Sequence, residues 1–304
     1  MEYNNEEFLK EKLQEQYNSE DIERIYSGLK SKRYVTLRVN TLKSNKDKIL
    51  KVLADQEIEY EGVKWSDVAY IIKNRTENQL EELEIYKSGE IYLQSLSSML
   101  PPIVLEPQFN EDILDMTAAP GGKTTQIAAI TENQSHITAC EMNNIRAEKL
   151  KYNIEKQGAT SVYVMQKDSR NNDNCFLFDR ILLDAPCSGS GTLYIDKENA
   201  DAFKYFSAKL VEKSTKAQLA LLKKAIQILK PGKEIVYSTC SILACENEDI
   251  ISQILKSSKA EIIPIEFEGI NDLPLLPTKL KGTVCVCPND LYEGFFIAKL
   301  RKKA

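Results

Sequence analysis

Residues 113–129 read ILDMTAAPGGKTTQIAA, and this stretch decides the fold that the sequence predicts. It opens with apolar residues, reaches Asp115, crosses a turn of small residues and continues as the first turns of a helix. A strand, a glycine turn and a helix in this order form the nucleoside- and phosphate-binding corner of an α/β sheet. Gly121 and Gly122 allow a ligand to approach the main chain, and the free N–H groups of the helix start favour an acceptor or anion there.

The tail of this stretch, Gly122 to Thr125, also resembles a P-loop, whose pattern is G-x-x-x-x-G-K-[ST]. The first glycine of that pattern would fall at position 117, which is Thr. Pro120 has no N–H in the place where phosphate-facing N–H groups would be needed. These mismatches disfavour an NTPase, and an ordinary tight turn is the other alternative for the stretch taken alone.

The composition is typical of a soluble globular protein of about two domains. Its 304 residues are 42% hydrophobic and 28% charged, and the acidic start MEYNNEEFLK does not resemble a signal peptide. No uncharged apolar run is long enough to span a bilayer. The seven cysteines are an odd number with irregular spacing, which indicates a reducing compartment. We therefore expect a cytoplasmic monomer with no membrane contact.

The single histidine, His136, excludes most histidine-dependent chemistry. A Ser-His-Asp or Cys-His scheme would have to use it, and no nucleophile motif stands beside it. A zinc site rich in histidine is impossible with one histidine. We interpret His136 as a surface or strand-edge residue, and we predict that the protein binds no metal.

Hydrophobic periodicity predicts a small α+β domain at residues 1–93. Its elements are two helices within 4–31, a strand at 34–40, a helix at 47–56, a helix at about 77–86, and strands at 68–74 and 89–95. Opposed only by Asp47, the segment from Lys30 to Lys51 carries Lys30, Lys32, Arg33, Arg38, Lys43, Lys46, Lys48 and Lys51. This excess of positive charge in a protein of net charge −5 suits either a polyanion partner or a solvated face.

Residues 94–304 predict one larger domain in which strands and helices alternate. A helix at 96–107 leads into it, and strands at 136–142, 161–168, 178–187 and 234–241 alternate with helices at 145–158, at 208–230 and from about 246. Such alternation is typical of a parallel sheet with helices on both faces. The continuous apolar run near 178–187 indicates a central strand that is buried on both faces. Segments 283–288 and 294–300 are expected to add a final antiparallel pair.

Acidic residues stand where four predicted strands end: Asp115, Glu141, Asp168 and Asp184. Ligands of open α/β sheets bind outside the carboxyl ends of the strands, so these side chains should share one rim. An acidic residue at the end of the second strand is the usual partner of ribose hydroxyls. Each carboxylate alone would also serve as a helix N-cap, but four in series behind a glycine turn favour a nucleoside. The chain has no G-x-G-x-x-G pattern, which disfavours a dinucleotide.

Two cysteines are expected at the same edge of the sheet. Cys187 lies in DAPCSGSG after the fourth strand, and Cys240 lies in STCS at the end of the fifth. A lone cysteine is most often a small core residue. A cysteine on a loop of small residues at the open end of a sheet is better placed to react. We interpret the remaining cysteines as structural: Cys140, Cys175, Cys245, Cys285 and Cys287. Cys285 and Cys287 have no second pair with which to form a zinc site.

Several motifs together carry a resemblance to a known family. They are DMTAAPGGKT at 115–124, LDAPCSGSGT at 183–192, and YSTCS at 237–241 followed by ENED, with RVNTLK at 38–43, YLQSLSSMLP at 92–101 and GFFIAKL at 294–300 in support. In these motifs the chain resembles the Sun-type (NOL/NOP2/Sun, RsmB/NOP-like) RNA cytosine-5 methyltransferases. Thr117 stands where that family usually has Cys, and the stretch before Gly294 lacks a His often found there.

This resemblance implies a Rossmann-like class I methyltransferase domain and S-adenosylmethionine as cofactor. The cofactor-binding residues that it implies are Thr117, Ala118, Ala119, Pro120, Gly121, Gly122, Lys123, Glu141, Arg146, Asp168 and Asp184. The turn would hold the methionine part of the cofactor, Glu141 its ribose and Asp168 its adenine.

The resemblance also implies a covalent mechanism for methylation of carbon 5 of cytosine. Cys240 matches the family nucleophile, which adds to carbon 6 of the ring as a thiolate. Asp184 would bind or protonate ring nitrogen 3, and Lys123 would orient Asp184. Cys187 would assist removal of the carbon 5 proton and release of Cys240. A base within a stem must leave the stack to reach these groups.

Two other function classes stay open: a small-molecule or protein methyltransferase, and a catalytically silent RNA-binding module. The first would need neither two reactive cysteines nor the basic segment. The second would tolerate loss of Cys240 or Asp184, and both are present. With the resemblance, we expect the domain at residues 1–93 to dock RNA. Its short length slightly favours transfer RNA over ribosomal RNA as the partner.

Overall fold

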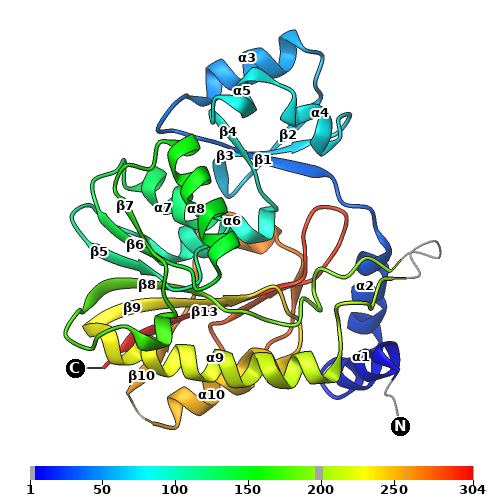
Figure 1. Ribbon diagram of the computed structural model, residues 1–304. Helices are drawn as coiled ribbons and strands as arrows, with labels where there is room; N and C mark the ends of the chain where they lie inside the picture. Colours follow the sequence, from blue (N-terminus) through cyan, green and yellow to red (C-terminus); the bar gives the residue numbers. More distant parts are fainter. Residues whose placement is uncertain (1–3, 196–200, 258, 304) are drawn as a thin grey trace. The chain divides into compact units, whose positions relative to one another are not determined.

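The computed structural model describes residues 4–195, 201–257 and 259–303. The chain divides into two compact units, whose elements are labelled in Figure 1. Unit 1 comprises Met1–Arg33, Leu183–Ile265 and Leu273–Ala304, and unit 2 comprises Tyr34–Leu182 and Glu266–Asp272. The division into domains 1–93 and 94–304 stays a prediction, because grouping residues by contact does not identify segments that fold independently.

A four-stranded antiparallel sheet forms one part of unit 2, in the order β2-β3-β1-β4. Its elements are β1 Val35–Val39, β2 Tyr60–Val63, β3 Ser66–Ile72 and β4 Ile91–Leu93, with helices α3 Lys46–Asp55, α4 Glu77–Glu81 and α5 Glu84–Lys87. The predicted helix at about 77–86 is therefore two short helices. Strand β2 was not predicted, because most of its side chains are exposed and show no apolar alternation.

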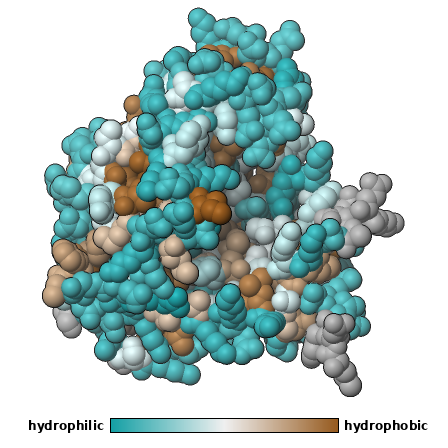
Figure 2. Space-filling view, viewed as in Figure 1, coloured by the Kyte–Doolittle hydropathy of each residue, from teal (hydrophilic) through white to brown (hydrophobic). Residues whose placement is uncertain are grey.

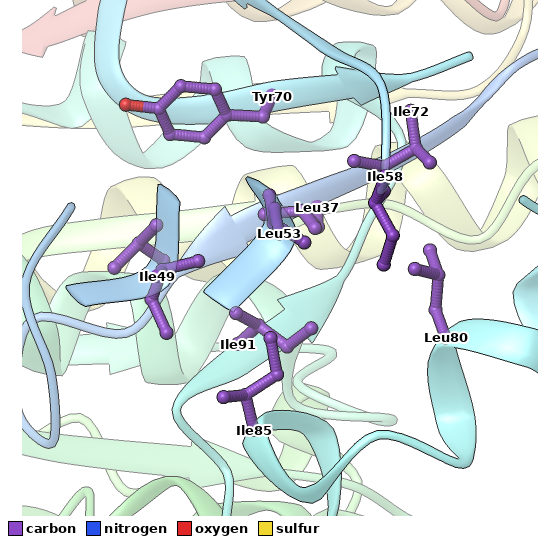
Figure 3. Close-up of a cluster of buried hydrophobic side chains, with 10 residues drawn as sticks. Leu37, Ile49, Leu53, Ile58, Tyr70, Ile72, Leu80, Ile85 and Ile91 are labelled. Carbon is purple, nitrogen blue, oxygen red and sulfur yellow. The ribbon is translucent and has the colours of Figure 1, made fainter. Parts of the chain in front are cut away.

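A hydrophobic core joins this sheet to its helices. In Figure 3 side chains from the strands and from α3, α4 and α5 point toward one another, among them Leu37, Ile49, Leu53, Leu80 and Ile91, all with no exposed surface. Burial of one such Leu or Ile contributes about 1.5–3 kcal/mol of transfer free energy. The apolar positions that indicated helices and strands in this segment are the positions that fill this core.

The second part of unit 2 is a parallel sheet in the order β8-β5-β6-β7. Its elements are β5 Asp112–Asp115, β6 His136–Cys140, β7 Val162–Met165 and β8 Phe178–Asp184, with helices α6 Leu96–Leu105, α7 Gly122–Ile130 and α8 Asn144–Gln157, the 3-10 turn η1 Ser169–Asn171 and the turn η3 Ile270–Asp272. Ile181, Leu182 and Leu183 have no exposed surface, which confirms the predicted buried central strand. Gly158 ends α8 in the left-handed conformation, with φ of +69°, as its sequence position predicts.

Unit 1 contains four α-helices and antiparallel strands in its described residues. Its elements are α1 Asn5–Gln14, α2 Ser19–Lys30, α9 Ala208–Ile228, β9 Leu229–Thr239, the 3-10 turn η2 Ala244–Glu246, α10 Glu248–Leu255, β10 Ala260–Ile263, β11 Leu275–Leu276, β12 Val284–Val286 and β13 Phe295–Lys302. Strand β13 pairs antiparallel with β9, β10 and β12. The expectation of a mostly parallel sheet with an antiparallel last strand is therefore confirmed.

Helix α9 ends slightly earlier than its pattern predicts. The prediction places the end at residue 230, whereas the helix ends at Ile228 and strand β9 already begins at Leu229. The residue before a proline is pushed toward extended backbone, so the helix cannot continue up to Pro231. Strands β10 and β11 were not predicted, because two to four residues are too few to show a period.

The surface is mainly hydrophilic in the view of Figure 2, where separate hydrophobic groups interrupt it. Three of the exposed apolar side chains lie on α8 or just before it: Met142, Ile145 and Tyr152. In the described part of the chain, no helix is both long and apolar enough to cross a membrane.

Candidate active site

The turn between β5 and α7 is held from both sides by hydrogen bonds. Asp115, only 1% exposed, accepts a hydrogen bond from Thr124 Oγ1 at 2.7 Å, and the Ala118 N–H donates to the carbonyl of Cys140 at 2.9 Å. Gly121 has φ of +114°, which other residues rarely adopt, and immediately precedes α7. A Cβ on Gly121 would lie 3.1 Å from Leu150 Cδ1, a tight contact that adds to the backbone preference for glycine. Asp115 thus supports the turn from inside.

Helix α8 fixes the two carbonyl groups of this turn. Arg146 donates to the carbonyl of Ala119 at 2.9 Å, and Asn153 donates to the carbonyl of Pro120 at 2.8 Å. Arg146 was named from the sequence, but Asn153 was not. The two residues are seven positions apart, or about two helical turns, so they lie on the same face of α8. That spacing is the signal that could have identified Asn153.

Glu141 and Asp168 follow neighbouring strands of unit 2. Glu141 is 5% exposed, accepts a hydrogen bond from the Asn143 N–H at 2.8 Å and lies 3.4 Å from Arg146. Asp168 caps η1 and binds Arg170, whose closest nitrogen is 2.6 Å away, and these hydrogen bonds lower the pKa of Asp168. The structure therefore brings the turn, Glu141 and Arg146 together, and places Asp168 after the adjacent strand.

Lys123 continues from the glycine turn into a polar network within unit 2. Its Nζ donates to Ser98 Oγ at 2.7 Å, and Gln94 donates to the carbonyl of Ser98 at 3.1 Å. Arg38 in turn donates to Gln94 at 3.2 Å and to Thr125 Oγ1 at 3.2 Å. These contacts connect the RVNTLK, YLQSLSSMLP and DMTAAPGGKT motifs, which are far apart in the sequence.

Arg38 corrects one sequence-based expectation. It was counted among the basic residues of a docking segment, yet it is 2% exposed and cannot meet a phosphate. Burial lowers the pKa of its guanidinium to about 10, so it is still charged at neutral pH. The exposed cations of the segment fall into two groups: Lys30 and Lys32 belong to unit 1, and Lys43, Lys46, Lys48 and Lys51 belong to unit 2.

The two cysteine loops meet within unit 1. Cys187 follows β8, Cys240 follows β9, and their sulfur atoms lie 3.0 Å apart as free thiols. The Gly191 N–H donates to the carbonyl of Cys240 at 3.0 Å, which ties one loop to the other. A Cβ on Gly191 would lie 2.0 Å from the carbonyl oxygen of Gly294, so only glycine fits where these two backbone segments pass each other. The structure thus brings together two thiols that are 53 positions apart in the sequence.

Asp184 lies at the end of β8, three residues before Cys187. Its Oδ1 accepts a hydrogen bond from Ser238 Oγ at 2.7 Å, and Ser238 precedes Cys240 by two residues. The hydrogen bond to Cys240, followed by burial and by the negative charges of Cys240 and Glu246, holds the pKa of Cys187 well above its ordinary value. Cys187 therefore keeps its proton at neutral pH and can donate it to a neighbouring sulfur.

The remaining cysteines differ in burial, and the single histidine is exposed. Cys140, Cys285 and Cys287 are buried and His136 is exposed, as expected for structural thiols and a surface histidine. Cys245 is partly buried, and Cys175 is exposed, which does not fit the structural role predicted for it.

Two family models match the chain. Residues 102–301, more than half of the chain, match the model described as 16S rRNA methyltransferase RsmB/F. Residues 6–78 match the model described as the RsmF/B-like methyltransferase ferredoxin-like domain.

Curated relatives are similar over most or all of this chain. The tRNA (cytosine(49)-C(5))-methyltransferase of Pyrococcus abyssi is 35% identical over 98% of both chains. The 25S rRNA (cytosine-C(5))-methyltransferase nop2 of Schizosaccharomyces pombe is 35% identical over 99% of this chain and 51% of its own length. Ribosomal RNA small subunit methyltransferase F of Shewanella loihica is 34% identical over 88% of this chain and 56% of its own length. The chain thus spans about half of these two rRNA relatives.

Solved structures share the fold. A methyltransferase homologue from Pyrococcus horikoshii is 30% identical, with a TM-score of 0.81 over 96% of this chain and 98% of its own. NSun6 from Pyrococcus horikoshii, at 23% identity, has a TM-score of 0.84 over 97% of this chain and 98% of its own. These likenesses confirm the Rossmann-like methyltransferase fold. With the matches to the family models and to the curated relatives, they show that the chain belongs to the Sun-type RNA cytosine-5 methyltransferase family.

Proposed function

We propose that this protein methylates carbon 5 of a cytosine in RNA and that Cys240 forms a covalent adduct with the base. The observation that carries the proposal is the 3.0 Å separation of Cys187 Sγ and Cys240 Sγ, on the two loops whose motifs mark the family. The relatives support the reaction class, because they are named for cytosine-C5 methylation of tRNA and 25S rRNA. A small-molecule or protein methyltransferase would not need a second sulfur beside the first.

S-adenosylmethionine is the proposed cofactor, and when bound it supplies an electrophilic methyl group. The residues of unit 2 fit it, since Glu141 offers a buried carboxylate for ribose hydroxyls and the Gly121 turn leaves the start of α7 without a side chain. We place the methionine part at residues 117–123 and the adenine near Asp168. The structure of NSun6 from Pyrococcus horikoshii contains SFG, an analogue of S-adenosylmethionine.

The reacting groups of this chain have separate proposed roles. The Cys240 thiolate adds to carbon 6 of cytosine, which makes carbon 5 nucleophilic enough to accept the methyl group. Asp184, held by Ser238, binds ring nitrogen 3 and stabilises the adduct, and Lys123 orients that carboxylate. Cys187 then gives its proton to the sulfur of Cys240 as the bond between carbon 6 and that sulfur breaks, and the Cys187 thiolate so formed accepts the carbon 5 proton. This transfer restores the Cys187 thiol and releases the product.

Transfer RNA is the proposed substrate class. The relative that matches over 98% of both chains is named for cytosine 49 of tRNA, whereas the rRNA relatives extend well beyond the matched region. The monomeric state and the cytoplasmic location stay predictions.

Methylation of RNA by the purified protein tests the proposed function. With labelled S-adenosylmethionine and unmodified tRNA transcripts, we expect label in 5-methylcytosine, and bisulfite sequencing should locate it, with position 49 examined first. Label in ribosomal RNA alone would reject the tRNA assignment but keep the reaction. Label only in protein or in small molecules would reject the reaction.

Replacing Glu141 by Ala is expected to weaken the binding of S-adenosylmethionine. The substitution removes charge-assisted hydrogen bonds to the ribose worth about 1.5–3 kcal/mol, so affinity should fall about tenfold or more. Calorimetry measures the affinity, and Glu148→Ala on the exposed face of α8 is the matched control. Unchanged affinity in Glu141→Ala, or tight binding of ATP by the wild type, would reject the cofactor assignment.

Replacing Lys43, Lys46 and Lys48 together by Ala is expected to make RNA binding less dependent on salt. All three are exposed in unit 2, but Lys48 is partly neutralised by Glu90, 2.6 Å away. The slope of log affinity against log salt should therefore become shallower by about two, because fewer counterions are released. Binding of S-adenosylmethionine should not change. An unchanged slope would mean that these lysines form only a solvated surface.

A further inference from the structure

Glu246 is a fully buried carboxylate that lies behind the two cysteine loops and has no part in the mechanism above. It ends the 3-10 turn η2 and begins the ENED motif. Its Oε1 accepts from the Ser188 N–H at 2.8 Å and from Gln218 at 3.3 Å. Its Oε2 accepts from the hydroxyls of Ser188 at 2.5 Å and Ser241 at 2.6 Å.

These donors come from both cysteine loops at equivalent positions. Ser188 directly follows Cys187, and Ser241 directly follows Cys240. One carboxylate group therefore restrains the residue next to each sulfur. Since the two sulfurs are only 3.0 Å apart, a change of the carboxylate at Glu246 would move one loop relative to the other.

The same hydrogen bonds indicate that Glu246 is ionised. Distances of 2.5 and 2.6 Å fall in the range of charge-assisted O–H···O⁻ hydrogen bonds. The Ser188 N–H and the Nε2 amino group of Gln218 can only donate to Oε1, so that oxygen must act as an acceptor. Burial raises the pKa of Glu246, and the hydrogen bonds from Ser188, Ser241 and Gln218 oppose that rise.

The hydrogen bonds of Glu246 are divided unequally between the two cysteine loops, since two come from Ser188, next to Cys187, and one comes from Ser241, next to Cys240. Glu246 is among the groups that raise the pKa of Cys187, because a second negative charge beside it is unfavourable. Cys240 also raises the pKa of Cys187, and Tyr237 is a further ionisable group of unit 1 that interacts with Cys187. If one of the two sulfurs is a thiolate, its negative charge is therefore disfavoured on Cys187.

We propose that Glu246 is a positioning residue that holds both cysteine loops and assigns the thiolate to Cys240 by keeping the proton on Cys187. The proposal rests on the proposed function for its consequence, which is that the nucleophile and the proton-transferring thiol are not interchanged. Its core claim concerns the two thiols alone, so it can be tested without RNA or cofactor.

The test is the pH dependence of alkylation of each cysteine, measured by peptide mass spectrometry after short exposure of the full chain to iodoacetamide. In the wild type we expect Cys240 to react well before Cys187 as pH rises. In Glu246→Gln the charge is lost, so the rate of Cys187 relative to Cys240 at neutral pH should rise about tenfold, as for a change of one pKa unit. An unchanged ratio in folded Glu246→Gln would overturn the proposal.

Glu248→Gln is the matched control, because Glu248 is also buried and lies two residues away, while its charge acts on Cys285 and Tyr17. Its alkylation ratio should equal that of the wild type, and a rise equal to that of Glu246→Gln would overturn the assignment to Glu246. Circular dichroism checks that each variant is folded.

Glu246→Asp keeps the charge but shortens the reach, and it replaces Glu246→Gln if that variant does not fold. We expect its Cys187 to stay unreactive at neutral pH while RNA methylation falls about tenfold or more, because a shorter side chain cannot hold Ser188 and Ser241 together. Wild-type methylation by Glu246→Asp would overturn the positioning role. If the wild type methylates no RNA while the alkylation results hold, the proposed function fails and the assignment of charge stands.

Discussion

Replacing Cys240 by Ala is expected to abolish both methylated product and covalent complex. Without the sulfur that adds to carbon 6, carbon 5 of cytosine is too weak a nucleophile, and the loss of a covalent nucleophile can cost about a millionfold in rate. Product is measured as labelled 5-methylcytosine in tRNA. The covalent complex is measured as an enzyme–RNA species that survives a denaturing gel.

Replacing Cys187 by Ala should give the opposite pattern on the gel. Its proposed role begins after methyl transfer, so this variant should still attack and transfer the methyl group, and then stall as a stable complex. If the stalled complex forms with Cys240→Ala instead, Cys187 is the nucleophile and the two cysteines have the opposite roles. Full activity of both variants would mean that the 3.0 Å sulfur pair only fills space.

Replacing Asp184 by Asn is expected to lower the rate of methyl transfer by about 100- to 10,000-fold, the usual effect of removing an acid or base group. An amide is nearly the same size as the carboxylate and can still meet the Ser238 hydroxyl, 2.7 Å away in the wild type. It cannot stabilise positive charge or transfer a proton at ring nitrogen 3. The measurement is kcat at saturating RNA and cofactor.

Asp179→Asn is the control for this substitution. Asp179 lies on the same strand, β8, but toward its other end, where its carboxylate accepts from the Asp112 N–H at 3.1 Å. We expect methylation by Asp179→Asn to equal that of the wild type. A loss of less than a few fold in Asp184→Asn would show that ring nitrogen 3 is bound by another group.

The sequence by itself determined the order of the elements and the place of the glycine turn. Local features of the sequence include the apolar run of β8, the hydrophobic period of α8 and the glycine at the end of α8. Such features depend only on residues that are close in the sequence. The motifs around Gly121, Cys187 and Cys240 identified the family for the same reason, because each is a short contiguous segment. Strands β2, β10 and β11 escaped prediction because short or exposed strands carry little apolar pattern.

Only the tertiary structure decided which of these segments meet. Arg38 looked like a surface cation in the sequence and is instead buried against Gln94 and Thr125. Asn153 supports the glycine turn and Glu246 joins the two cysteine loops, and neither contact is visible in the sequence, although Asn153 has helical spacing from Arg146 and Glu246 begins the ENED motif. Such contacts form between residues that are tens of positions apart, so they depend on the order and register of strands in the sheet, which single-segment periodicity does not encode.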